Sequence, residues 1–231
     1  MTANPSVSQQ LISAAADGQT SKVRGLLSLP LQFSDYNLFC ALYQAAHGGH
    51  VECLETLLAG AGFSPPHPYF YQTFNAAVAG GHLACVARLA PLCSTSQRFA
   101  GLSVAAQHGQ TSVLEFMIGA GFAAVCDNHI ALVVAAKHGN ADCVRLLLNV
   151  LDARANNSQA LCMAALEEHV ECVDLLYPHS CPLTALKQLK IHYPDSAFAH
   201  SLLEHAIERH QRKVLVEAIN TCGRDAPGRK I

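Results

Sequence analysis

The sequence predicts an all-α helical solenoid of about six to seven helix–turn–helix repeats. One seventeen-residue pattern recurs seven times, with a large apolar residue at its first position and, in most copies, alanine at its fourth and fifth. The first five copies also carry a glycine at the eighth position. Starts of the first six copies are 28 to 32 residues apart, a period typical of stacked repeats. The copies begin at Leu11, Leu42, Phe74, Leu102, Leu132, Leu161 and Leu202.

Each copy predicts two short helices joined by a tight turn. In the second copy, Leu42 and Ala45 lie one turn apart on one face of a helix, and the small alanine lets a neighbouring helix approach closely. Gly49 follows, and glycine ends helices in the left-handed region without a steric penalty. Leu54 and Leu57 then mark the apolar face of a second helix. Two such helices cannot bury both faces alone, so we expect neighbouring repeats to supply the core.

These boundaries predict one repeat domain over residues 1–220 and a flexible tail over 221–231. In the last copy Arg209 replaces the turn glycine, which indicates a cap. The cap includes a helix from Leu183 to His192, closed by Pro194, and a further helix leading into Leu202. We expect repeats near 8–30, 39–63, 71–93, 99–122, 129–151 and 158–180, and a divergent C-terminal cap over 181–220.

The copies resemble ankyrin repeats over roughly residues 8 to 180. The resemblance rests on the Ala-Ala pairs, Gly49-His50, Gly81-His82 and Leu57-Leu58, and on GAGF at 60–63 and 119–122, which is similar to the family's link to the next finger. The family's Thr-Pro-Leu-His motif is missing, and the short period leaves few residues between copies, so we expect reduced β-hairpin fingers. The prolines of SPPHPYFY at 64–71 predict a rigid loop before the third copy.

Cysteine and histidine recur inside the pattern, which raises the alternatives of a metal site or a catalytic thiol. Other copies place Lys22, Val113 and Lys213 at the cysteine position, so we interpret it as a packing site. A metal ion needs ligands within about 2.0–2.3 Å, whereas stacked helices lie about 8–10 Å apart. We therefore predict no metal, no cofactor and no enzyme activity, with a Cys–His hydrolase as the competing class. The recurring cysteines are Cys53, Cys85, Cys143 and Cys172.

The histidine after the turn has a structural interpretation as well. It begins the second helix, where its ring can hydrogen-bond backbone groups of the turn. The resemblance implies the same role. These histidines are His50, His82, His169 and His210.

Composition narrows the function. Half of the chain is apolar (51%) and the net charge is −2, so a large core can form and a dedicated nucleic-acid surface is disfavoured. No apolar run is long enough to span a bilayer, and no signal sequence is recognisable. We expect a cytoplasmic protein with reduced thiols, monomeric and without a membrane or nucleic-acid partner.

The resemblance implies a non-catalytic scaffold or adaptor that binds a protein partner on the concave face of the repeat array. Alternatives are the recognition domain of a larger protein, such as a bacterial effector secreted into host cytoplasm, and a structural protein that stacks end to end. The family's contact surface corresponds to positions three residues before each copy and to the pair before the turn glycine. The predicted contacts are Phe39, His47, Tyr71, Phe99, Gln107, His108, His129, Lys137, His138 and Glu167.

Two alternatives concern these contacts. The aromatic rings can instead cover the edge of the core. Histidine changes charge between about pH 5 and 8, so partner binding through His47, His108, His129, His138 and His67 becomes a pH-dependence hypothesis. The competing interpretation is that these are surface histidines without a coupled role.

Overall fold

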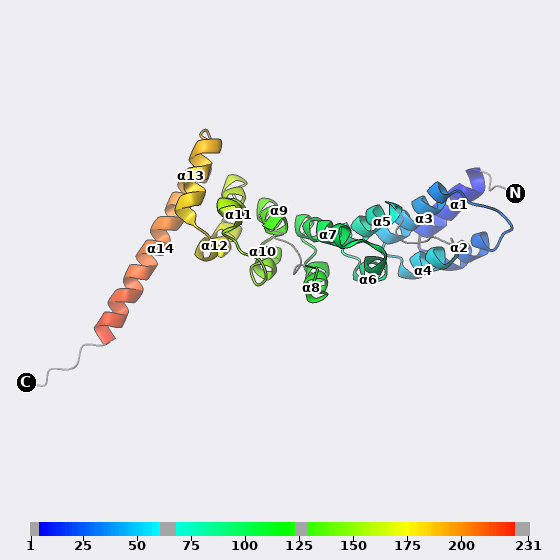
Figure 1. Cartoon of the computed structure of the whole chain (residues 1–231), viewed down its shortest axis with the longest axis horizontal. Helices are drawn as coiled ribbons and strands as arrows, with labels where there is room; N and C mark the ends of the chain where they lie inside the picture. The colour runs from blue at the N-terminus through cyan, green and yellow to red at the C-terminus, as the bar shows by residue number, and fades with distance from the viewer. Residues whose placement is uncertain (1–4, 61–67, 123–128, 225–231) are drawn as a thin grey trace, which may run out of the picture.

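The computed structural model describes residues 5–60, 68–122 and 129–224. Those residues form fourteen α-helices and two short 3-10 helices, and they contain no β-strand. The helices stack into a long array in which odd-numbered and even-numbered helices form two rows (Figure 1). The predicted all-α solenoid is thereby confirmed, whereas the segments 61–67 and 123–128, in which two of the reduced fingers were expected, lie outside the described residues.

Six helix pairs make up the array. They are α1 Pro5–Ala16 with α2 Thr20–Leu27, α3 Asp35–His47 with α4 Val51–Gly60, α5 Pro68–Ala79 with α6 Leu83–Leu89, α7 Thr95–Gln107 with α8 Thr111–Gly119, α9 His129–Lys137 with α10 Ala141–Leu147, and α11 Ala155–Leu166 with α12 Val170–Leu176. The 3-10 helices η1 Ala90–Leu92 and η2 Tyr177–His179 extend α6 and α12. Two longer helices follow, α13 Pro182–His192 and α14 Ala197–Arg224.

Glycine forms the turn inside each of the first five pairs, as predicted. Gly49 has φ +74° and donates its N–H to the Ala46 carbonyl, while the next N–H, from His50, reaches the Ala45 carbonyl at 2.8 Å. The left-handed residue thereby satisfies carbonyls that the end of α3 would otherwise leave free. The sixth pair makes the same turn with Glu168 at φ +64°, a conformation that is costly for a residue with a Cβ.

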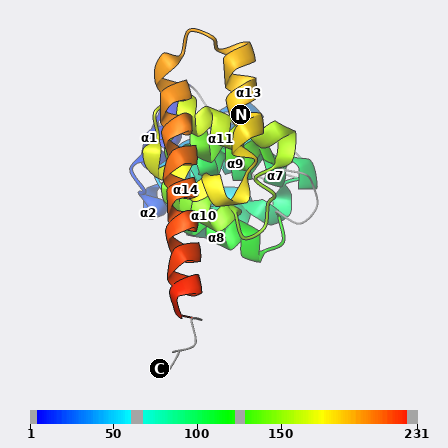
Figure 2. The same cartoon turned by 90° about the vertical axis from the view of Figure 1, so that its left-hand side faces the viewer.

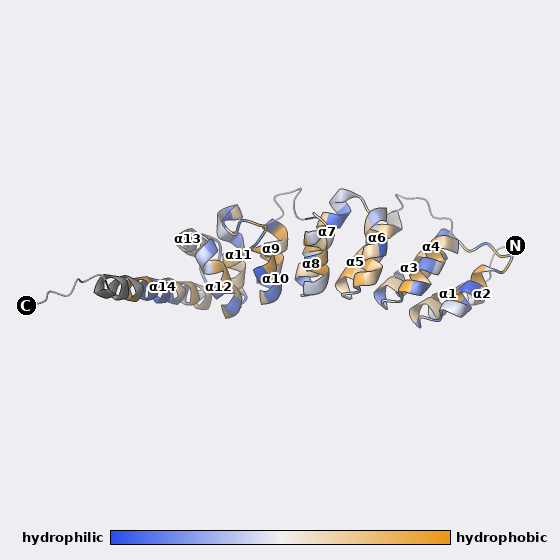
Figure 3. Cartoon of the chain, turned by 90° about the horizontal axis from the view of Figure 1, so that it is seen from below, coloured by the Kyte–Doolittle hydropathy of each residue, from blue (hydrophilic) through white to orange (hydrophobic). Residues whose placement is uncertain are grey.

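The core runs the length of the array between the two rows. The paired alanines, including Ala45, Ala46, Ala105 and Ala106, are fully buried, and their small side chains let successive odd helices pack closely. Leucines of the even helices, such as Leu54 and Leu147, close the core from the other side. Figure 3 shows apolar residues in every helix pair. The buried residues of all the repeats form one cluster, so no repeat has an interior of its own.

Two sequence-based expectations are wrong. Residues 68–71 are not loop, because α5 begins at Pro68; proline is tolerated at the first helical position, where its missing N–H has no partner to lose. The remainder of that segment, 64–67, lies outside the described residues. The seventh copy is not a helix–turn–helix either: α14 continues through Arg209 as one helix, since no glycine interrupts it.

The C-terminal end forms a cap of two antiparallel helices (Figure 2). Helix α13 ends at His192, as the sequence predicts, and Ala185 and Leu189 face the body. Helix α14 packs on α11, α12 and α13 through Ala199, Leu203 and Ala206, and its second half extends beyond the array. Helix α14 includes residues 221–224 of the predicted flexible tail, and 225–231 lie outside the described residues.

Candidate functional site

Histidine at the start of an even helix ties one repeat to the one before it. The Nε2 atoms of His50, His82 and His169 lie 2.9–3.0 Å from the backbone carbonyls of Ala16, His47 and Lys137. A carbonyl only accepts, so Nε2 carries the proton and donates in each case. The predicted backbone role is therefore seen for these three rings, and their partners belong to the preceding repeat. His210 differs, because it lies inside α14 with its ring 4.9 Å from that of Tyr177.

Amide side chains replace the imidazole at the two remaining junctions. Gln110 donates from Nε2 to the Ala79 carbonyl at 2.7 Å. Asn140 donates from Nδ2 to the carbonyls of Ala106 and Gln107, at 2.6 and 2.9 Å. Histidine, glutamine and asparagine all donate a hydrogen bond to a carbonyl of the preceding repeat at this position. The position therefore holds neighbouring repeats together, and this role does not require an imidazole.

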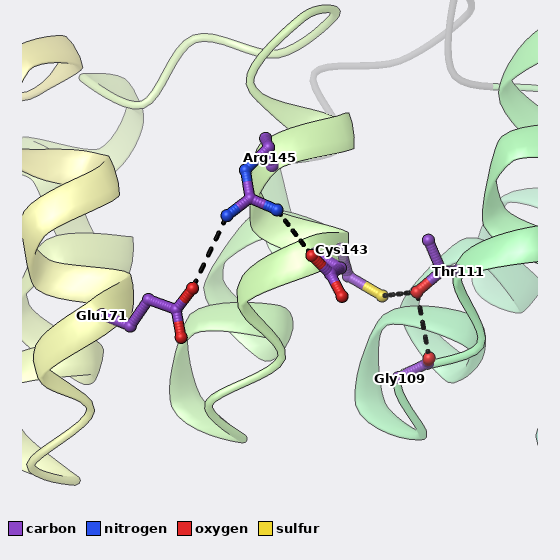
Figure 4. A network of polar contacts seen from close by, with 6 residues as sticks. Gly109, Thr111, Cys143, Arg145 and Glu171 are labelled. Atoms are coloured by element: carbon purple, nitrogen blue, oxygen red, sulfur yellow. Dashed lines mark hydrogen bonds and ion pairs between the residues drawn. The ribbon is translucent and has the colours of Figure 1, made fainter.

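The recurring cysteines are packing residues as well. Cys53, Cys85, Cys143 and Cys172 are at most 1% exposed. Burial raises the pKa of the Cys85 and Cys172 thiols to about 11, which keeps them protonated and poorly nucleophilic at neutral pH. Thr111 lies 3.9 Å from the Cys143 sulfur and also donates to the Gly109 carbonyl (Figure 4). In the described part of the chain, no three His, Cys, Asp or Glu side chains gather as a metal site.

Charged side chains pair with one another along the even helices. Arg88 on α6 reaches Glu55 on α4 at 2.7 Å, and Arg145 on α10 reaches Glu171 on α12 at 3.5 Å (Figure 4). Further along, Arg209 on α14 lies 2.9 Å from the Asp174 carboxylate. These pairs are half exposed, so each contributes about 0–1 kcal/mol. They bridge successive repeats and neutralise one another on the exposed sides of the even-numbered helices, which we term the even-helix face.

The opposite side, the odd-helix face, consists of the exposed sides of α1, α3, α5, α7, α9 and α11. It carries a hollow of about 590 Å³, the central groove, across α3, α5 and α7. The lining combines aromatic, imidazole, amide and small apolar side chains. It is formed by Tyr43, His47, Gln72, Asn75, Ala76, Ala79, Val104 and His108.

Two of the predicted contact residues, His47 and His108, line this groove from opposite walls. The His47 ring is nearly parallel to that of Tyr43 at 6.2 Å, and Tyr43 in turn meets the edge of Phe39 at 6.1 Å. A short aromatic row therefore runs along α3 beside the groove. Tyr71 on α5 is half-buried.

Phe99 behaves differently from the other predicted aromatics. Its side chain is partly buried and packs against the core cluster. This is the arrangement of the alternative interpretation, in which the ring covers the core edge. We therefore expect a change at Phe99 to affect stability as well as any contact made by this surface.

The remaining predicted residues lie along the ends of the odd helices. Gln107, Lys137 and Glu167 are exposed where α7, α9 and α11 end. His138 bonds through Nδ1 to the Val134 carbonyl at 2.9 Å, and His129 contacts the Asn156 amide. These two rings lie outside the central groove. His67 lies outside the described residues.

Sequence reasoning missed five residues of the groove lining: Tyr43, Gln72, Asn75, Ala76 and Val104. The signal was present for Tyr43, Asn75 and Val104, because each lies four residues before a position already selected, one helical turn away on the same face. Gln72 could not be found this way, since its place in the groove depends on how α5 sits beside α3.

Comparison with known proteins identifies the class. A family description of three ankyrin repeats matches residues 102–187, and the single ankyrin repeat matches residues 37–65. The chain belongs to the ankyrin-repeat family, whose members are generally protein–protein interaction modules. No curated protein sequence matches the chain.

Among solved structures, the human ASB11 ankyrin repeat domain is similar in fold. The match has a TM-score of 0.67 at 20% sequence identity, and it covers 88% of this chain and 98% of that domain. At this identity the likeness describes the fold alone. Among the helices described here, none is both long and apolar enough to cross a membrane.

Proposed function

We propose that the protein is a non-catalytic interaction module that binds a protein partner on its odd-helix face, with the central groove as the centre of contact. The groove itself carries this proposal. It joins three successive repeats and offers Tyr43 and two imidazoles beside amide groups, a mixture favoured at protein interfaces. The even-helix face has fewer side chains available for a partner, because several of its charged side chains already pair with each other.

The competing enzyme class has weak support. Its nucleophile would have to come from the cysteines, and four of these, Cys85, Cys93, Cys162 and Cys172, are buried, which raises each pKa to about 11. Of the described cysteines only Cys181 is exposed. Buried, protonated thiols are inert. The described cysteine side chains are all unpaired, which fits a protein of a reducing compartment such as the cytoplasm.

Partner capture by the full chain tests the proposal. The bait is compared with a variant in which Phe39, Tyr71 and Phe99 are changed to alanine, and with a control variant in which Leu83 on α6, Val170 on α12 and Val150 in the connection after α10 are changed to alanine. The control residues are also apolar, and they are at least 40% exposed, more than the half-buried residues of the first set. We expect capture to fall only for the first variant. Because Phe99 packs on the core, a thermal melt of each variant must show that it stays folded.

A second odd-helix-face variant avoids the core altogether. Ala79→Arg places a long side chain in the groove, and Ala59→Arg places the same side chain on α4, on the other face. Loss of capture with Ala79→Arg but not with Ala59→Arg supports the groove as the contact. Equal capture by the two variants would show that the partner binds outside the groove.

The mode of assembly is part of the same proposal. We propose a monomer that acts as a free adaptor, or as the recognition domain of a larger protein such as a secreted effector. Light scattering over a tenfold concentration range separates this from end-to-end stacking through the caps, in which the mass would rise with concentration.

A further inference from the structure

The chemistry of the central groove restricts what it can bind. Its described lining contains no carboxylate, ammonium or guanidinium group, whereas ion pairs such as Arg88–Glu55 lie on the even-helix face. A charged partner group seated in the groove would lose water without gaining a counter-charge, which is unfavourable. An uncharged ligand avoids that cost.

The floor of the groove holds an unused hydrogen-bonding group. Asn75 lies on α5, and its Oδ1 atom is shielded from solvent with no hydrogen-bond partner among the described residues. A buried acceptor without a donor is unfavourable, and because the Asn75 side chain as a whole is only half-buried, a rotation of its amide would present Oδ1 to an incoming N–H. Gln72, nearly one turn earlier, is exposed and offers a second amide. Each amide has a donor and an acceptor, the complement of a peptide unit.

The size of the groove fits a short length of extended chain. Helices packed side by side lie about 8–10 Å apart, so the distance from α3 to α7 is about 20 Å. An extended peptide spans this with about six residues at roughly 3.3 Å each. Tyr43 and His47 form one wall, while Val104 and His108 form the other, so apolar side chains of such a peptide find partners on both sides.

The same chemistry recurs at a second hollow on this side of the molecule. A pocket of about 190 Å³ between α11 and α13 is lined by the amides of Asn156, Gln159 and Gln188, together with Met163 and Tyr193. Its described lining also lacks a charged carboxylate, ammonium or guanidinium group. The uncharged, amide-rich character is therefore not confined to the central groove.

We propose that the central groove binds an extended, uncharged peptide segment of a partner protein, and that the Asn75 amide hydrogen-bonds to its backbone. This rests on the proposed function, since it assumes that the odd-helix face is the contact surface. To the proposed function it adds the chemical class of the partner segment and the residue, Asn75, that hydrogen-bonds to the backbone of that segment.

A random library of twelve-residue peptides displayed on phage, selected against the full chain, tests the proposal. Selected peptides are synthesised, and their dissociation constants are measured for the wild type, for Asn75→Leu, and for Asn149→Leu. Asn149 is the matched control, because it is an exposed asparagine in the connection after α10, outside the groove. Thermal melts check that each variant is folded.

We expect the selected peptides to share about six consecutive uncharged residues. Their affinity should change less than about twofold between 0.05 and 0.5 M NaCl, because salt screens only charged contacts. Asn75→Leu should weaken binding by about fivefold or more, and Asn149→Leu should leave it unchanged.

Several results would overturn the proposal. Peptides rich in acidic or basic residues with steep salt dependence would contradict the uncharged class, as would failure to select any peptide. Equal loss with Asn75→Leu and Asn149→Leu would remove the backbone contact. In these cases the partner capture with Ala79→Arg still decides the proposed function separately. If selected peptides bind Ala79→Arg as well as the wild type, the groove is not their site and the peptide proposal fails, whereas the proposed function fails only if partner capture is also unchanged by Ala79→Arg.

Discussion

The turn glycines make a testable link between backbone conformation and the stacking of repeats. Gly49 has φ +74°, and a Cβ added there would lie 2.5 Å from Nδ1 of His82 in the next repeat. That imidazole donates from Nε2 to the His47 carbonyl at 2.9 Å. Gly49→Ala therefore strains its own turn and also pushes away the ring that joins the third repeat to the second.

The expected cost has two parts. A residue with a Cβ in the left-handed region costs about 1–2 kcal/mol. Displacing the His82 ring loses a hydrogen bond of about 0.5–1.5 kcal/mol and disturbs the packing around it. We expect Gly49→Ala to lower the free energy of unfolding by about 2–3 kcal/mol. Gly121→Ala is the matched control, because Gly121 has φ +79° but no other atom lies within 4 Å of its added Cβ.

Urea unfolding of the two variants, with His82→Ala and the Gly49→Ala/His82→Ala double variant, measures both parts. Gly121→Ala should show the backbone cost alone, about 1–2 kcal/mol. In the double variant the added Cβ has no His82 ring to displace. Its loss of unfolding free energy should therefore be about 1 kcal/mol smaller than the sum of the two single losses. The reasoning is refuted if Gly49→Ala costs no more than Gly121→Ala, or if the effects at Gly49 and His82 simply add.

Three further predictions use the same unfolding assay. His50→Ala should lower stability by about 1–2 kcal/mol by leaving a carbonyl unpaired, while His50→Gln should retain most of it, as Gln110 does at its own junction; equal losses would contradict this. Glu168→Gly should raise stability by up to about 1 kcal/mol by relieving φ +64°, and a loss would show that the side chain has another role. Four buried thiols have a folded pKa of about 11 against an ordinary 9.0, so the unfolded state releases their protons first and stability should fall between pH 9 and 11, by up to about 1.4 kcal/mol per pH unit for each thiol. Replacing one by alanine should make the decline shallower, and an unchanged slope would refute it. These thiols are Cys85, Cys93, Cys162 and Cys172.

Some of the candidate site was open to prediction from local pattern. His47 and His108 were found because each stands just before a turn glycine, and such a position is exposed wherever a helix ends. Phe99 was selected because it lies three residues before the copy that begins at Leu102, yet its ring packs on the core. Spacing along the chain fixes the side of a helix but not how deeply a neighbouring repeat covers it.

The sequence by itself determined the helix pairs, their turns and the buried cysteines, since these follow from periodicity within about seventeen residues and from the freedom of glycine at positive φ. Only the tertiary structure decided which side chains meet across repeats. Asn75 became the floor of a groove because α3 and α7 flank α5, and Arg145 met Glu171 because α10 lies beside α12. Such contacts depend on the relative placement of whole helices, which many weak packing interactions set together and no local pattern records.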